Sequence, residues 1–358
     1  KPGLPILEVP FPDGTSRFYW NTFYQSDDPD SLLAQVDLNA ESEVVWEFYE
    51  KTMEKLASYG ARIVRLDAFA YLHKEIGSSN FFNEPGTWNY LSRIREIAGR
   101  FNITLLPEIH SKYEDRTHEK LAERGYPFYD FFFPGLVINA IETGEGAALA
   151  SWIEEIGEKR FSTVNMLGCH DGIPLLDLTG YLEDGAIEEM IGLITGRGGV
   201  VKDLYGPDGT KISYYQVNAT FFSALGEDPK KLLLARAIQL FMPGIPQIWY
   251  LDLFGGTNDY DAAERIGHKA INRTNLTSEE IQARLQWPLV QKQLELIQFR
   301  NTFPAFGPDA ELTVENSTPR RLRLSWSKAG RRATLDADLE SHEYEIACEG
   351  SDVSPTGG

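Results

Sequence analysis

Apolar residues recur along the chain in two patterns, which predict strands and helices in alternation. Short apolar runs predict strands at 63–69, 103–110, 129–133, 162–168 and 244–251. Apolar positions three or four residues apart predict helices at 43–59, 87–101, 117–124, 136–143, 146–157 and 229–241. Because strands that alternate with helices favour a parallel sheet with right-handed crossovers, we expect an α/β fold with about five βα units.

Two stretches interrupt this alternation. Residues 1–42 are rich in proline, aspartate and aromatic residues, and only 18–23 resembles a strand. Residues 174–230 are rich in glycine and indicate an insertion. We therefore expect a partial (β/α) barrel at 43–307, interrupted at about 174–230.

The pattern changes again toward the end of the chain. A long helical region at 279–300 is interrupted at Pro288. Beyond it, alternation of apolar and polar residues predicts strands at 321–326, 333–337 and 344–347. We therefore expect a small C-terminal β domain at 308–349, followed by a disordered tail at 350–358.

Composition excludes several classes of protein. The net charge of −19 argues against a nucleic-acid binder, because few cations are available to neutralise phosphates. The two cysteines, Cys169 and Cys348, show neither zinc spacing nor a disulfide framework, which suits a reducing cytosol. No apolar run reaches the ~18–20 residues of a membrane span. We expect a cytoplasmic protein without membrane, nucleic-acid or metal partners.

Polar residues gather at the carboxyl ends of three predicted strands, where βα barrels carry their catalytic groups. These residues are Arg65, Asp67, Glu108 and Asp171. An isolated Arg-x-Asp is usually a structural ion pair, but three carboxylates at one sheet edge repel one another and suit glycoside chemistry. Asp67, held ionised by Arg65, is the expected nucleophile. Glu108 follows an apolar run and is the expected general acid and base, while Asp171 would stabilise oxocarbenium charge.

Two histidines follow the same strand ends. His110 lies two residues beyond the candidate acid Glu108, and His170 directly precedes Asp171. Each could bind a sugar hydroxyl or could be a structural histidine, and for each residue the two interpretations are about equally favoured.

Three motifs carry a family resemblance. Arg65-Leu-Asp-Ala, Pro107-Glu-Ile-His110 and Cys169-His-Asp-Gly172 resemble the three later conserved blocks of the α-amylase superfamily, glycoside hydrolase family 13. A finer resemblance is to the sucrose phosphorylase subfamily, which includes sucrose 6′-phosphate and glucosylglycerol phosphorylases. It rests on Tyr215–Gly226, Phe241–Tyr250, Gly256–Asp259 and Ile271–Arg273.

This resemblance implies a (β/α)8 TIM barrel in which residues 1–42 are the remnant of an inserted B domain. It implies a retaining phosphorolysis of a glucoside that yields α-glucose 1-phosphate by double displacement. A sugar and inorganic phosphate would be the substrates, without a cofactor, in a monomer or homodimer. The positions matching contacts to the glucosyl ring are Arg65, His170, Gln216 and Arg273. Those matching the wall and the mobile loop of the site are Tyr71, His110, Tyr215 and Gln216.

The chain departs from the subfamily pattern at two places. Ser213 stands where an aspartate is typical, and Gly267-His268-Lys269 replaces the usual Gly-Arg-Asp. Loss of the negative charge at position 213 would suit an anionic acceptor such as fructose 6-phosphate, although fructose, glycerol and glycerate stay open; the second departure bears on the setting of Arg273. A hydrolase or transglucosidase using the same carboxylates is the alternative enzyme, and an inactive sugar-binding fragment is the alternative outside catalysis.

The first conserved block of the superfamily has no counterpart in this sequence. The resemblance therefore implies that only about the last five of eight βα units are present, and that strand 63–69 is the fourth strand of the barrel. Because unpaired sheet edges invite aggregation, we expect this polypeptide alone to be inactive and the longer protein to be active.

Overall fold

The computed structural model describes residues 6–22, 36–205, 211–307, 309–315 and 318–350. The chain forms two compact units: unit 1 is Lys1–Ile109 with Leu204–Ser213, and unit 2 is His110–Asp203 with Tyr214–Gly358. Parts of the expected B-domain remnant (1–5 and 23–35) and nearly all of the expected tail (351–358) lie outside the described residues. The division into domains at 42, 307 and 349 stays a prediction.

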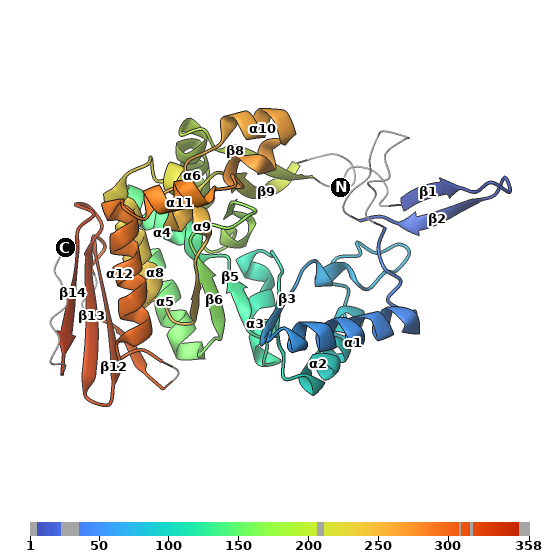
Figure 1. Ribbon diagram of the computed structural model, residues 1–358, viewed down its shortest axis with the longest axis horizontal. Helices are drawn as coiled ribbons and strands as arrows, with labels where there is room; N and C mark the ends of the chain where they lie inside the picture. Colours follow the sequence, from blue (N-terminus) through green and yellow to red (C-terminus); the bar gives the residue numbers. More distant parts are fainter. Residues whose placement is uncertain (1–5, 23–35, 206–210, 308, 316–317, 351–358) are drawn as a thin grey trace. The chain divides into compact units, whose positions relative to one another are not determined.

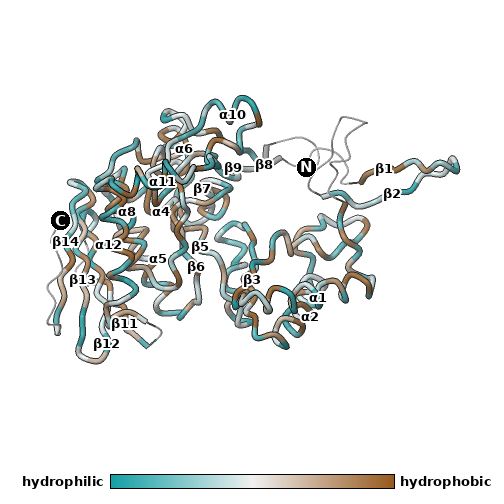
Figure 2. The backbone as a smooth tube through the Cα atoms, viewed as in Figure 1, coloured by the Kyte–Doolittle hydropathy of each residue, from teal (hydrophilic) through white to brown (hydrophobic). Residues whose placement is uncertain are grey.

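Unit 1 begins with an antiparallel hairpin of β1 (Ile6–Pro10) and β2 (Ser16–Trp20), followed by helix α1 (Glu43–Ser58). Figure 2 shows β1 as a hydrophobic stretch and the following turn as hydrophilic. The strand expected at 18–23 therefore begins earlier and ends at Trp20, and its partner β1 was not predicted.

The rest of unit 1 is a parallel strand pair with one crossover helix. Strand β3 (Ile63–Leu66) pairs with β4 (Thr104–Pro107), and α2 (Gly86–Arg100) connects them after the short 3₁₀ helix η1 (Phe69–Tyr71). The register runs from Ile63 opposite Thr104 to Leu66 opposite Pro107.

Both strands of this pair are shorter than expected, which corrects the predictions of 63–69 and 103–110. Strand β3 ends because Ala68 adopts a left-handed conformation (φ 54°), which an extended strand does not accommodate. Strand β4 ends at Pro107, which has no N–H to donate to the ladder. Asp67 and Glu108 each follow directly after a strand end, and the Glu108 N–H donates to the Leu66 carbonyl at 3.1 Å.

Unit 2 contains a second parallel sheet, in the order β10–β6–β5. Its strands are β5 (Phe128–Asp130), β6 (Thr163–Met166) and β10 (Ile245–Gln247). The helices between them are α3 (Thr117–Glu123), α4 (Phe133–Thr143), α5 (Ala147–Lys159) and α8 (Pro229–Phe241).

The strands of this sheet are also shorter than predicted. Strand β5 ends before Phe133 because the Asp130 carboxylate accepts the Phe133 N–H at 3.1 Å and Pro134 fits the first turn of α4. Strand β10 ends at Gln247, and helix α9 (Tyr250–Leu253) occupies the end of the strand expected at 244–251. Strands β5 and β6 are buried along their whole length, whereas β10 is only partly buried, with Ile245 54% exposed.

Among the described residues, hydrogen bonds join the five parallel strands as two sheets, β3–β4 and β5–β6–β10, whereas we expected one. The division coincides with the boundary between the two units at Ile109 and His110. The chain is thus α/β with parallel crossovers, and the number of barrel units stays a prediction.

The glycine-rich stretch contains regular structure. It holds β7 (Ile173–Pro174), η3 (Leu176–Leu178), α6 (Asp184–Gly196), β8 (Val200–Tyr205), β9 (Lys211–Asn218) and α7 (Phe221–Ala224), with sheet order β7–β9–β8. After α8 and α9 come α10 (Tyr260–Ile266), the 3₁₀ helix η4 (His268–Asn272), α11 (Ser278–Arg284) and α12 (Pro288–Thr302). The break expected at Pro288 is confirmed, since this proline begins α12. Of the helices described, none has the length and apolar composition that crossing a bilayer requires.

The last part of unit 2 is an antiparallel sheet of four strands in chain order. They are β11 (Glu311–Val314), which was not predicted, β12 (Arg321–Lys328), β13 (Arg331–Asp338) and β14 (Tyr344–Glu349). In Figure 1, α12 and α8 run side by side next to this sheet. The Trp326 indole N–H donates to the Phe241 carbonyl at 2.8 Å, and Leu324 and Leu335 join the core of α4 and α8. The sheet therefore shares one hydrophobic core with the helices.

A buried histidine makes the stability of unit 2 depend on pH. His118 on α3 is 5% exposed, its ring stacks on Tyr113 at 5.4 Å, and neither ring nitrogen has a hydrogen-bond partner among the described residues. Burial lowers the pKa of His118 to about 4, and the opposing charges of Glu119 and Glu155 do not compensate. The folded state therefore holds this imidazole neutral.

We predict that stability falls on acidification through this residue. Because the pKa of folded His118 (about 4) lies below its unfolded value, the unfolded state binds more protons between about pH 6.5 and pH 4. The unfolding free energy should lose up to about 3 kcal/mol across that window. Urea titrations at pH 7 and 4.5 would measure the loss. The His118→Phe variant should reduce the pH slope, whereas the control His342→Gln should retain it. An unchanged slope in His118→Phe would contradict the prediction.

Candidate active site

The strand ends of unit 1 bring Arg65, Asp67 and Glu108 together, as parallel neighbours in register should. The Arg65 guanidinium forms an ion pair and hydrogen bond with Glu108, and it lies 3.7 Å from the Asp67 carboxylate. The Glu108 side chain is 11% exposed and that of Asp67 is 75% exposed. We expected Arg65 to serve Asp67; in the structure its hydrogen bond goes to Glu108, because Glu108 follows β4 beside Leu66 and is the more buried carboxylate.

The environment of Glu108 favours its protonated form. Burial raises the pKa of Glu108 above its ordinary value, the Arg65 charge opposes this, and the nearby Asp67 carboxylate adds to it. Burial is the largest of these effects, so the pKa moves in the direction that a general acid requires.

Tyr71 lies in the same unit, at the end of η1. Its ring packs edge-on against Phe81 at 5.1 Å, and burial raises the pKa of its hydroxyl. The left-handed Ala68 turns the chain between Asp67 and η1, so the position of Tyr71 depends on a backbone conformation that a non-glycine residue rarely adopts.

Unit 2 holds the other predicted residues, gathered around Asp171. Its carboxylate lies 3.1 Å from Arg273, 3.2 Å from His170 and 3.7 Å from Lys269. Burial alone would raise the pKa of Asp171, but these positive partners outweigh burial, and the pKa lies below its ordinary value. Asp171 is therefore held as a carboxylate.

The turn that carries Asp171 is built from close backbone approaches. Gly168 N–H donates to the buried Asp252 at 2.9 Å, and a Cβ at Gly168 would meet that carboxylate at 2.9 Å. Gly172 has φ +97°, and a Cβ there would come within 2.4 Å of the Val217 carbonyl. Both ends of the Gly168–Gly172 turn therefore require glycine.

Side chains from later elements hold the same turn. Gln216 and Asn218 of β9 donate their amides to the Asp171 carbonyl, the latter at 2.9 Å. Arg273 donates through Nε to the His170 carbonyl at 2.8 Å. Gln216 and Arg273 were expected at the glucosyl ring; in the structure each also fixes the backbone that carries Asp171.

His110 is held by an acidic partner that the sequence analysis missed. Its Nδ1 lies 2.9 Å from Asp177, which is 3% exposed, and its ring stacks on Phe131 at 3.9 Å. The edge of the Tyr215 ring meets it at 5.3 Å. Asp177 stands between two leucines, and a lone acid in an apolar run was the available signal.

Positive charge exceeds negative charge around Asp171. The Lys202 ammonium lies over the Tyr215 ring at 4.9 Å from its centroid. Burial and the neighbouring Lys269 lower the pKa of Lys202, and burial together with both lysines lowers that of His268. The Asp171 carboxylate opposes the effect of Lys269 on the pKa of Lys202, so both lysines and this carboxylate share one electrostatic environment.

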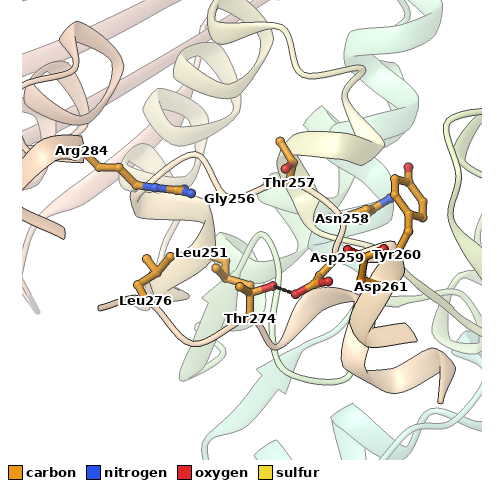
Figure 3. Close-up of a pocket in the computed structure, with 10 residues that line it drawn as sticks. All are labelled: Leu251, Gly256, Thr257, Asn258, Asp259, Tyr260, Asp261, Thr274, Leu276 and Arg284. Atoms are coloured by element: carbon orange, nitrogen blue, oxygen red, sulfur yellow. Dashed lines mark hydrogen bonds between the residues drawn. The ribbon is translucent and has the colours of Figure 1, made fainter. Parts of the chain in front are cut away.

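Unit 2 contains a pocket of about 290 Å³. It is lined by the 256–261 loop with Leu251, Thr274, Leu276 and Arg284, and none of the predicted catalytic residues lines it (Figure 3). Asp259 accepts from the Thr274 hydroxyl at 3.0 Å, the dashed line of Figure 3, and its N–H donates to the Ile271 carbonyl. The Gly256–Asp259 motif therefore fixes the segment that carries Arg273.

One group in the described part of the chain has metal-ligand types in proximity. Ligand atoms of His118, Glu119 and Glu155 lie within 4.8 Å of one another. The Lys159 ammonium already pairs with Glu119 at 2.5 Å and with Glu155 at 2.8 Å. Because this cation occupies both carboxylates, we assign no metal to the group.

Comparisons with known proteins connect these groups to a family. No family model matches the chain. The chain is 58% identical to the sucrose 6(F)-phosphate phosphorylase of Ilumatobacter coccineus, over 98% of this chain and 69% of the relative. It is 32% identical to the glucosylglycerol phosphorylase of Marinobacter adhaerens, over 96% of this chain and 69% of that protein.

Comparison with solved structures gives a result consistent with the sequence comparisons. The crystal structure of sucrose 6F-phosphate phosphorylase from Thermoanaerobacter thermosaccharolyticum matches with a TM-score of 0.88 and 35% identity, over 96% of this chain and 69% of that one. An α-amylase from H. orenii matches with a TM-score of 0.58 and 16% identity, over 95% of this chain and 63% of that one, which bears on the fold alone.

The fold is therefore the α/β architecture of amylase-type enzymes. Within that class, the chain belongs to the sucrose phosphorylase family of glucoside phosphorylases, which are enzymes of the glycosyltransferase type.

Proposed function

We propose that this protein is a retaining phosphorylase that transfers the glucosyl unit of sucrose 6′-phosphate, or of a closely related glucoside, to inorganic phosphate. Asp67 is the nucleophile, Glu108 the general acid and base, and Asp171 the carboxylate that stabilises oxocarbenium charge. Substrate contacts are assigned to Arg65, Tyr71, His110, His170, Tyr215, Gln216 and Arg273.

In the first step an Asp67 carboxylate oxygen forms a bond to the anomeric carbon. The glycosidic bond breaks, its electron pair goes to the leaving oxygen, and that oxygen takes the Glu108 proton. The raised pKa of Glu108 supports this assignment, because the residue must carry a proton near neutral pH.

In the second step a phosphate oxygen attacks the anomeric carbon and displaces Asp67. Glu108, now ionised, accepts the proton from phosphate, and Arg65 stabilises the negative charge that Glu108 carries between the two steps. Two inversions give net retention and yield α-glucose 1-phosphate.

The observation that carries this proposal is the opposite tuning of two carboxyl groups. Burial raises the pKa of Glu108, whereas the cations around Asp171 lower its pKa. Acid and base assignments follow from titratable groups whose environments push their pKa values apart.

The reaction type is tested by incubating the protein from its complete gene with sucrose or sucrose 6′-phosphate, with and without inorganic phosphate. We expect α-glucose 1-phosphate only when phosphate is present. Free glucose or oligosaccharides at equal rates in both mixtures would identify a hydrolase or transglucosidase instead. Absence of turnover with sugar binding retained would identify a non-catalytic sugar-binding protein.

The preference for a phosphorylated sugar is supported by the charge around Asp171. Lys269 stands where the subfamily resemblance leads us to expect an aspartate, and its charge is felt by both Lys202 and His268. Ser213 likewise replaces a typical aspartate. A phosphate monoester would neutralise this excess of cations.

We predict that Lys269→Met lowers the ratio of kcat/KM for sucrose 6′-phosphate over sucrose by about 10-fold or more, the size of one charged hydrogen bond. The ratio is the readout, because a general effect on Asp171 would change both substrates alike. Lys230→Met removes an exposed lysine that pairs with Glu343 and should leave the ratio unchanged. An equal loss for both substrates in Lys269→Met would remove Lys269 from acceptor recognition.

The cellular location and assembly are also proposals. Both Cys169 and Cys348 are free thiols, which supports the predicted reducing, cytoplasmic setting. A monomer or homodimer remains the expected assembly.

A further inference from the structure

Asp177 is a buried acidic residue whose charge requires hydrogen-bond partners. It lies in η3 between Leu176 and Leu178 and is 3% exposed. One carboxylate oxygen lies 2.9 Å from His110 Nδ1, and the other accepts the Ser111 N–H at 3.3 Å. The two oxygens therefore bind two consecutive residues, His110 and Ser111, which follow Glu108 closely in the sequence.

The His110 ring is fixed on three sides. Phe131 stacks on its face, with centroids 3.9 Å apart and planes at 24°. Tyr215 meets it at 5.3 Å and 66°, and an Asp177 carboxylate oxygen lies 2.9 Å from Nδ1. Stacking opposes tilting of the imidazole, and the contact of Nδ1 with the carboxylate opposes a ring flip, so Nε2 is held on the side of the ring away from Asp177.

A buried carboxylate beside Nδ1 also fixes the protonation pattern. An ionised aspartate only accepts hydrogen bonds, so Nδ1 of His110 must carry the proton. The carboxylate stabilises positive charge on the ring when Nε2 binds a second proton, as in other histidine–carboxylate pairs. An apolar residue at position 177 would do neither, and an amide has one acceptor oxygen for the two donors, His110 Nδ1–H and the Ser111 N–H.

The neighbours of His110 indicate an anion as its ligand. Tyr215 contacts both the His110 ring and the Lys202 ammonium, which sits 4.9 Å from the Tyr215 centroid. An imidazole, a phenol and an ammonium gathered around one residue suit an oxyanion better than a neutral hydroxyl.

We propose that Asp177 is a positioning residue that holds His110 in the Nδ1–H form, with Nε2 directed to an oxygen of the phosphate that takes the glucosyl unit. This inference rests on the proposed phosphorolysis. Asp177 belongs to none of the sequence motifs. Its positioning role explains why an acid is buried in an apolar helix turn.

A purely structural role is the competing explanation, since Asp177 also binds the Ser111 N–H and since the Tyr113 N–H donates to the Thr179 carbonyl at 3.0 Å. The two explanations differ in how the effects of substituting Asp177 and His110 combine. A positioning residue acts through His110, so its loss should cost nothing further once His110 is removed.

The test is a double-mutant cycle with a spectroscopic readout. The Asp177→Asn substitution keeps the side-chain volume. The new amide NH₂ group can turn toward His110, and Nδ1 would then have to accept a hydrogen bond instead of donating one. We expect kcat/KM for inorganic phosphate to fall about 10- to 100-fold in Asp177→Asn. The fall should be similar in His110→Gln, and no greater in the double variant than in His110→Gln. Long-range ¹H–¹⁵N correlation spectra should show Nδ1 of His110 protonated in the unmodified protein and altered in Asp177→Asn.

Glu142→Gln is the matched control. The Glu142 side chain is also largely buried, at 11% exposed, but it pairs with Arg197 at 2.9 Å and with Lys231 at 2.8 Å. It should leave the His110 spectrum and the kinetics unchanged.

Additive losses in the double variant, or an unchanged His110 spectrum in Asp177→Asn, would overturn the proposal. If the unmodified protein produces no glucose 1-phosphate, the proposed function fails by itself. The spectrum still tests the Asp177–His110 pair, because it requires no turnover.

Discussion

The Asp171 carboxylate and the turn beneath it are the constraint on which most of unit 2 depends. The turn follows β6, and amides from β9 close on the Asp171 carbonyl while Arg273 spans the His170 carbonyl and the Asp171 side chain. Elements from the glycine-rich stretch and from η4 are thus tied to one strand end. The Asp171 side chain is 26% exposed, and the cations around it outweigh the effect of burial and keep it ionised.

In unit 1 the same residue types have the opposite effect on the pKa of a carboxyl group. Its strand ends hold two carboxylates near a single guanidinium, and the more buried one, Glu108, takes the hydrogen bond. Burial outweighs the arginine, so the pKa of Glu108 rises, whereas at Asp171 the cations outweigh burial. The local balance of burial and positive charge therefore determines which carboxyl group carries a proton and which remains charged.

Local periodicity predicted the parts of the fold that depend on local patterns. Helix α8 has the predicted bounds, and Pro288 begins a helix as expected. The neighbouring positions of Arg65, Asp67 and Glu108 also followed from parallel strands ending at one edge. Strands β1 and β11 were missed because they are short and partly exposed.

What the sequence could not reveal depends on contacts between distant residues or on unusual backbone. The left-handed Ala68, which takes Asp67 out of the strand, has no signature in residue type. Arg65 had two carboxylates in reach, and only burial decides between them. Asp177 and His110 meet across 67 residues of sequence, so only the folded turn reveals the pair.

The central claim is that Asp67 forms a covalent bond to the glucosyl unit, and trapping that bond tests it most directly. The protein from its complete gene would be treated with a 2-fluoroglucoside that slows release of the glucosyl-enzyme, digested, and sequenced by mass spectrometry. The account predicts one added fluoroglucosyl group, on the peptide that contains Asp67, and its loss in Asp67→Asn. A label on another carboxylate, or the same labelling in Asp67→Asn, would contradict the account.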